Sequence, residues 1–177
     1  LWSFGRIGEP TVSPDKSTVL YAVTTYDIEE NKSYRDLYTV AINGGEPVRI
    51  TSTLEKESSA VWSADGKKIC FLSAKSGDMQ LWEMNADGSE AIQITEVKGG
   101  ISGFKYSPDG TKLLYTADVK IKQDVHDLFP DLPKANAYLE NDLMYKHWDE
   151  WVQTVPHPFV ADFTGKKIEN EKDILEG

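Results

Sequence analysis

The stretch "SGFKYSPDGTKLLYTA", residues 102–117, decides the fold because two close copies of it occur earlier in the chain. The copies are "EPTVSPDKSTVLYAV" at 9–23 and "SSAVWSADGKKICFLS" at 58–73. Each has a short apolar strand, a tight turn that begins at a serine, and a second strand. In the turn, aspartate accepts a backbone hydrogen bond and glycine supplies a positive φ. Lys16 replaces the glycine in the first copy, so this turn is the least favourable of the three.

A second pattern alternates with the first. It occurs as "LYTVAINGGEPVRIT" at 37–51 and as "LWEMNADGSEAIQIT" at 81–95. Each copy is a strand, a glycine-containing turn and another strand that ends in Ile-Thr. The two patterns together predict a repeating unit of four antiparallel strands.

The spacing of the patterns identifies the architecture. Leu37 and Leu81 are 44 residues apart, and the first unit has about six extra residues, which we assign to a longer polar loop at 24–36. Four-stranded units at this period predict an all-β fold that contains the first three blades of a β-propeller. The expected bounds are about 7–51 for blade 1, 52–95 for blade 2 and 96–177 for blade 3. Because propellers close with four to eight blades, we expect the chain to be part of a longer protein.

An insertion interrupts the third unit. It runs from about 118 to 156, after which "HPFVADFTGKKIENEKDIL" restores the strand–turn–strand pattern. Its first half contains a short helix candidate at 133–141, with a proline in the first turn. A long insertion in a compact repeat is more often functional than accidental.

The second half of the insertion, "LMYKHWDEWVQ" at 143–153, supplies the candidate binding residues. Its acidic pair can bind a cation, and its aromatic side chains can enclose that cation. Residue types alone leave a second interpretation open, in which the aromatics cover a blade edge and the acids are solvated. The candidate substrate-binding residues are Tyr145, His147, Trp148, Asp149, Glu150 and Trp151.

Composition excludes several classes of function. A formal net charge of −10 disfavours nucleic-acid binding and docking on anionic membranes. No apolar run is long enough to span a bilayer, and no signal-peptide pattern opens the chain. The single cysteine, Cys70, is expected to be a small buried side chain. The three histidines lack metal-site spacing, and no nucleophile elbow or phosphate-binding loop occurs, so we expect no cofactor, no metal and no catalytic residue.

Several motifs resemble a known family. The "SPDG" turns with "LWEMNADGSE" resemble TolB-like and prolyl oligopeptidase propellers. The opening "LWSFGRIGEPTVSPD" and the later "DLFPDLPKA", "DLMYKHWDEWV", "PHPFVADF" and "KDILEG" resemble, in order, the N-terminal propeller of the bacterial dipeptidyl-peptidase V group. These are serine exopeptidases of the prolyl oligopeptidase family, and the resemblance covers essentially the whole chain.

The resemblance implies a function. It implies that a C-terminal α/β-hydrolase domain, absent from this chain, holds the catalytic serine, and that the propeller restricts access and contacts the substrate's free N-terminus. Asp149 and Glu150 are the candidates for that contact, by analogy with dipeptidyl peptidases generally. The implied partners are peptides and the hydrolase domain, and the implied location is periplasmic or secreted. The alternatives are a non-catalytic TolB-like propeller that binds a protein, and an acylaminoacyl peptidase of the same family. We also expect self-association through the open faces of the outer blades.

Overall fold

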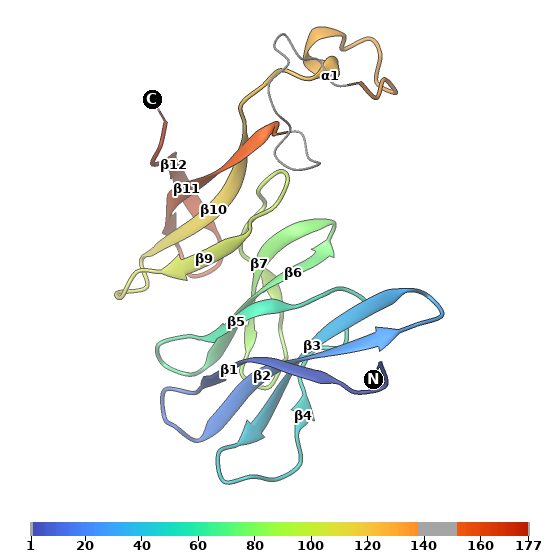
Figure 1. Cartoon of the computed structure of the whole chain (residues 1–177). Coiled ribbons are helices and arrows are strands. Elements are labelled where there is room, and N and C mark those ends of the chain that lie inside the picture. The colour runs from blue at the N-terminus through green and yellow to red at the C-terminus, as the bar shows by residue number, and fades with distance from the viewer. Residues whose placement is uncertain (1, 138–151, 177) are drawn as a thin grey trace.

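The computed structural model describes residues 2–137 and 152–176, which form three four-stranded antiparallel sheets (Figure 1). The strands follow chain order within each sheet, as expected for the predicted blades. Blade 1 contains β1 (Arg6–Val12), β2 (Thr18–Asp27), β3 (Lys32–Ala41) and β4 (Val48–Arg49). Blade 2 contains β5 (Ser58–Trp62), β6 (Lys68–Ser76), β7 (Asp78–Asn85) and β8 (Ile92–Gln93). Blade 3 contains β9 (Gly103–Tyr106), β10 (Lys112–Lys120), β11 (Thr154–Phe163) and β12 (Ile168–Asp173).

The turn between the first two strands of each blade has the predicted hydrogen bonds. The Asp109 carboxylate accepts from the Ser107 hydroxyl at 2.6 Å and from the Thr111 amide at 3.1 Å. The corresponding contacts of Asp15 and Asp65 are within 0.1 Å of these distances. The turn serine also accepts from the first residue of the next strand, at 2.9 to 3.0 Å in all three blades. Side chains within six residues of one another therefore build each turn.

The core lies between the blades. One cluster joins blades 1 and 2 and contains Leu20, Ala22, Leu37, Ala60, Ile69, Phe71 and Met84. The other joins blades 2 and 3 and contains Cys70, Leu72, Leu81, Ile94, Ile101, Leu113, Tyr115, Ala117 and Ala161. Successive residues of β6 point to opposite faces, so Ile69 and Phe71 pack toward blade 1, while Cys70 and Leu72 pack toward blade 3. A strand that is covered on both faces needs apolar residues at consecutive positions, which explains the run "ICFL".

Two details differ from the sequence predictions. The polar segment 24–36 is not a loop, because β2 and β3 stay paired to the Asp27↔Lys32 position and form a long hairpin. Among the described residues of the insertion the helix is α1 (Val125–Leu128); residues 133–137 of the predicted helix are turn or irregular, and 138–141 lie outside the described residues. Helix α1 begins at Val125 because Asp124 and Asp127 form a capping box: the Asp124 side chain accepts from the Asp127 amide, and the Asp127 side chain accepts from the Asp124 amide.

Candidate functional site at the insertion end of the blades

Strand direction places the insertion at one end of the blades. In an antiparallel sheet of four strands, the hairpin between strands two and three lies at the same end as the links between blades. This end, which we call the insertion end, carries the β2–β3 and β6–β7 hairpins, the β10–β11 connection and the N-terminal segment. In Figure 1 the β2–β3 and β6–β7 hairpins lie on the right, α1 lies at the top, and the three serine turns lie on the left.

A paired stem supports the insertion. The β10–β11 ladder is unbroken from Lys112↔Asp162 to Lys120↔Thr154. One further hydrogen bond, from the Ile121 amide to the Gln153 carbonyl at 2.9 Å, extends the stem beyond the sheet. The connection outside the ladder is thus 121–153, within the predicted range 118–156. A continuous ladder restrains both ends of the connection and gives any binding group on it a defined origin.

Charged contacts fix the first part of the connection. Lys120 donates to the Asp124 carboxylate at 2.7 Å and also to Asp127. The hydrogen bond from Lys120 lowers the pKa of Asp124 to about 2, so this carboxylate stays ionised at neutral pH. The ammonium thereby joins the last residue of β10 to the capping box of α1.

All six predicted binding residues lie outside the described residues. Tyr145, His147, Trp148, Asp149, Glu150 and Trp151 fall within 138–151. Their role stays a prediction, and the stem described above is the nearest part of the chain with a defined geometry.

A histidine–carboxylate pair stabilises the sheet near the stem. His157 of β11 and Asp173 of β12 are 2.7 Å apart, between the histidine Nδ1 and a carboxylate oxygen. The hydrogen bond lowers the pKa of Asp173. Sequence analysis did not single out this pair, since the two residues are 16 positions apart and only strand pairing brings them together. Within residues 2–137 and 152–176, no serine or cysteine side chain is hydrogen-bonded to a histidine, so this pair orients no nucleophile there.

An aromatic corner lies at the N-terminal side of the insertion end. The rings of Trp2 and Tyr26 meet edge to face, with centroids 5.2 Å apart. The Arg6 guanidinium lies over both rings, at 5.4 and 4.8 Å from their centroids. Two open cavities of about 460 and 580 Å³ share Trp2, Tyr26, Asp27 and Ile28 in their walls. Sequence analysis did not predict this corner. The one sequence feature that marked its position was the long polar segment at 24–36.

Two further cavities lie between blades. One of about 560 Å³ separates the β2–β3 hairpin from blade 2 and is lined by 31–34, 54–56, Ala74 and Met79. The other, of about 780 Å³, lies between the outer parts of blades 2 and 3, and its charged lining residues are Asp78, Glu96, Lys98, Lys167 and Glu171.

Cys70 is buried, as predicted from the sequence. Only 2% of the residue is exposed, and burial raises the pKa of its thiol to about 12. Its Sγ donates weakly to Glu83 at 3.8 Å. A thiol with this pKa is not a nucleophile at neutral pH.

The described residues contain neither a metal-binding cluster nor a membrane-spanning helix. In the ranges that the structure describes, no three histidine, cysteine, aspartate or glutamate side chains are grouped so that they could hold a metal ion. No helix in the same ranges is long and apolar enough to cross a bilayer.

Comparisons with known proteins agree with the architecture. The family model for the TolB beta propeller domain matches residues 3–135. Dipeptidyl-peptidase 5 of Porphyromonas gingivalis is 47% identical over 175 residues, which are 99% of this chain and 26% of the relative. Dipeptidyl-peptidase 5 of Porphyromonas endodontalis is 41% identical over 177 residues, or 100% of this chain and 26% of the relative. The chain therefore spans about a quarter of the length of these curated relatives.

Solved structures show the same fold. An acylaminoacyl peptidase from Pyrococcus horikoshii superposes with a TM-score of 0.66 at 20% identity and covers 98% of this chain and 26% of its own. TolB from Acinetobacter baumannii gives a TM-score of 0.55 at 18% identity, over 93% of this chain and 32% of its own. These likenesses confirm the predicted propeller blades.

Proposed function

The chain belongs to the TolB beta propeller family, and from this premise we propose that it is the N-terminal propeller portion of a serine dipeptidyl peptidase. One observation carries the proposal, namely the 47% identity over 99% of the chain to a protein named dipeptidyl-peptidase 5. The parent enzyme would release dipeptides from peptides with a free N-terminus. Its catalytic residues would lie in a hydrolase domain outside these 177 residues, so the chain alone would be inactive.

The propeller's task would be to admit and anchor the peptide. Asp149 and Glu150 would bind the substrate's N-terminal ammonium, and Tyr145, His147, Trp148 and Trp151 would exclude water around it. An anchored N-terminus leaves one peptide bond at the right distance from a fixed serine, which accounts for release of two residues at a time. The β10–β11 stem supports this role because it restrains both ends of the segment that carries the anchor.

The location and partners are part of the same proposal. We place the parent enzyme in the periplasm or outside the cell, in keeping with the family that the sequence resembles. Its partners would be peptides and its own hydrolase domain. Apolar residues left exposed on the outer blades, including Ile7 and Val12 of β1, support self-association of the chain when it is alone.

The substrate test uses the parent enzyme with a dipeptide reporter in two forms, one with a free amine and one acetylated. Cleavage of the free form alone supports the proposal. Cleavage of the acetylated form would instead identify an acylaminoacyl peptidase or an endopeptidase. Cleavage of neither would favour the second candidate, a non-catalytic propeller that binds a protein, which the TolB family match supports.

The anchoring test is the substitution Glu150→Gln in the parent enzyme. Removal of one charge from an ion pair in a water-poor site should lower kcat/KM for the free-amine reporter by about tenfold or more. Labelling of the catalytic serine by a covalent inhibitor should be unaffected. The matched control is Glu46→Gln, the same change at an exposed residue in the β3–β4 turn, at the opposite end of blade 1. Equal kinetics for the two variants would refute the anchoring role.

A further inference from the structure

Blades 1 and 2 contain the same hydrogen-bond framework around the threonine that follows the fourth strand. The Thr51 hydroxyl accepts from the Leu37 amide at 2.8 Å, and the Thr95 hydroxyl accepts from the Leu81 amide at 2.9 Å. In both blades a side chain two residues earlier donates to the threonine carbonyl, Arg49 at 2.9 Å and Gln93 at 2.7 Å. The two sites can therefore be compared atom by atom.

In blade 2 the framework is neutral and its hydrogen bonds are satisfied. Thr95 donates to the Gln80 side-chain oxygen at 2.7 Å, and the Gln80 amide nitrogen donates to the Val97 carbonyl at 2.7 Å. Next to this group, the amide of buried Ile101 donates to the Met79 carbonyl of blade 2 at 2.8 Å. Ile101 precedes the first strand of the following blade and closes the junction with an apolar side chain.

In blade 1 two carboxyl groups occupy the corresponding positions. Asp36 stands 44 residues before Gln80, and Glu57 stands 44 residues before Ile101. The Glu57 amide donates to the Arg35 carbonyl at 3.0 Å, which is the backbone contact that Ile101 makes in the next junction. Both side chains are buried, with Glu57 0% and Asp36 4% exposed.

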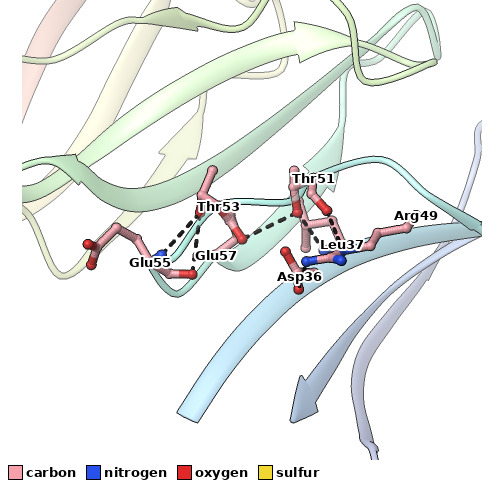
Figure 2. Close-up of polar contacts among 7 residues, drawn as sticks. All are labelled: Asp36, Leu37, Arg49, Thr51, Thr53, Glu55 and Glu57. Carbon is pink, nitrogen blue, oxygen red and sulfur yellow. Dashed lines mark hydrogen bonds and ion pairs between the residues drawn. The ribbon is translucent and has the colours of Figure 1, made fainter. Parts of the chain in front are cut away.

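The partners of these carboxyl groups leave one oxygen without a donor (Figure 2). Glu57 accepts from the Thr51 hydroxyl at 3.3 Å and from the Thr53 hydroxyl. Asp36 Oδ2 accepts from the Arg49 guanidinium at 2.7 Å. Asp36 Oδ1 is buried and has no hydrogen-bond partner among the described residues. An unpaired buried acceptor is costly, typically by about 1–3 kcal/mol, so a proton donor is expected near it.

Among the described residues Glu57 forms no ion pair, although its negative charge acts at a distance on Lys75 and Arg49. Arg49 of β4 is paired with Asp36, and Arg35 of β3 is paired with Glu9 at 2.9 Å. Lys75 of β6 lies over the Trp82 ring, 3.7 Å from its centroid. The contacts of Glu57 are with hydroxyl groups, and the other facing carboxylate, Asp36, repels a second negative charge.

We propose that Glu57, buried near Asp36, holds a proton in the closed junction at pH values where an exposed glutamate is ionised, and that loss of this proton opens the junction between blades 1 and 2. A neutral Glu57 removes the buried charge and supplies an O–H group in the same cluster as the orphaned Asp36 oxygen. An ionised Glu57 would add a second negative charge to a site where its own side chain is fully buried and the Asp36 carboxylate already takes the Arg49 guanidinium. The first strand of blade 2 follows Glu57 directly, so strain at this residue acts on the junction itself.

The direction of the pH effect follows from the burial. Burial is the largest effect that raises the pKa of Glu57, and the negative charge of Asp36 raises it further. The closed junction thus holds a proton that an open junction releases. Its stability is complete below the ordinary glutamate pKa, about 4.3, and is lost as the pH rises through the pKa of the closed state. Between the pKa of the open state and that of the closed state, the equilibrium constant for opening rises by up to about tenfold per pH unit, because opening releases one proton.

Hydrogen exchange of backbone amides tests the proposal, because the two junctions serve as test and reference in one molecule. The reporters are the amides of Leu37 and Glu57 at the first junction and of Leu81 and Ile101 at the second. Protection factors, corrected for the intrinsic exchange rate, are measured from about pH 5 to about pH 9. We expect protection at the first pair to fall more steeply as the pH rises than at the second pair, where burial also raises the pKa of Glu83 but Lys68 is paired with it at 3.8 Å.

Two variants complete the test. Glu57→Gln keeps the shape and cannot ionise, so it should abolish the pH-dependent loss at the first junction. Glu57→Ile copies the residue of the second junction and should do the same. Equal pH profiles at the two junctions of the wild-type protein, or an unchanged slope in either variant, would overturn the proposal. Should both variants fail to fold, the infrared spectrum of the wild-type protein decides, because above the ordinary glutamate pKa it must still contain the C=O band of a buried protonated carboxylic acid, and this band must disappear as the pH rises further.

Discussion

The packing of blade 2 on blade 1 can be tested at a single glycine. Gly88 lies in the β7–β8 turn with φ +88°, and a Cβ at this position would lie 2.5 Å from the Ile50 carbonyl oxygen and 3.0 Å from the Ile50 Cβ. Gly44 occupies the same turn of blade 1 with φ +90°, and no heavy atom lies within 4 Å of its Cβ position. Each glycine amide closes its turn with a 2.9 Å hydrogen bond to a carbonyl three residues earlier. The two glycines thus differ only in their neighbour.

This difference sets the size of the expected effect. Alanine in a left-handed conformation costs about 1–2 kcal/mol, and the loss of glycine's freedom in the unfolded chain returns about 0.4–1 kcal/mol. Gly44→Ala should therefore destabilise the chain by about 1 kcal/mol. In Gly88→Ala the new methyl group would also clash with the Ile50 backbone, which cannot shift independently of its neighbours. By analogy with overpacked cores, this clash costs about 1–3 kcal/mol. The second substitution should cost about 2–4 kcal/mol in total.

Urea unfolding followed by tryptophan fluorescence measures both variants. The midpoint should fall more for Gly88→Ala than for Gly44→Ala, with an unchanged m-value because the same surface is exposed on unfolding. Equal costs would refute the reasoning, since they would mean that the β7–β8 turn does not touch blade 1 in solution.

Two further predictions concern the chain by itself. Lys16 holds φ +61° where Gly66 and Gly110 hold +72° and +69°, so Lys16→Gly should stabilise the protein by about 0.5–1 kcal/mol in the same urea assay; a destabilised variant would contradict this account of the turn. The exposed apolar side chains of the outer blades, such as Ile7 and Ile174, should cause the isolated chain to form dimers or larger species; a monodisperse monomer by light scattering would count against it.

Local chemistry made the fold predictable. Each serine turn is built by side chains a few residues apart, so its hydrogen bonds can be inferred from the letters alone. The 44-residue spacing then indicates how many strands form one unit. The description of 24–36 as a loop was wrong because a hairpin that extends into solvent needs no apolar face, and its strands can be polar on both sides.

Sequence analysis did not predict α1, and the described part of the helix that it did predict, 133–137, is not helical. Sequence analysis favoured 133–141 for its proline and its helix-forming residues. The structure places α1 at Val125–Leu128, where an aspartate capping box and Lys120 provide specific contacts. This cap depends on two aspartates and on a lysine from the preceding strand. Its sequence signal is weak, because the lysine can be assigned to the cap only when the end of β10 is known.

The sequence by itself determined the β-strands, their turns, the repeat and, by resemblance, the family, because each depends on neighbouring residues or on a regular period. Only the tertiary structure decided the environment of Asp36 and Glu57. In the sequence they are two of 29 acidic residues, indistinguishable from solvated ones. The packing of blade 2 on blade 1 buries both, and Asp36 is paired with Arg49. Glu57 has no paired cation among the described residues, so it must hold its proton or destabilise the contact that buries it.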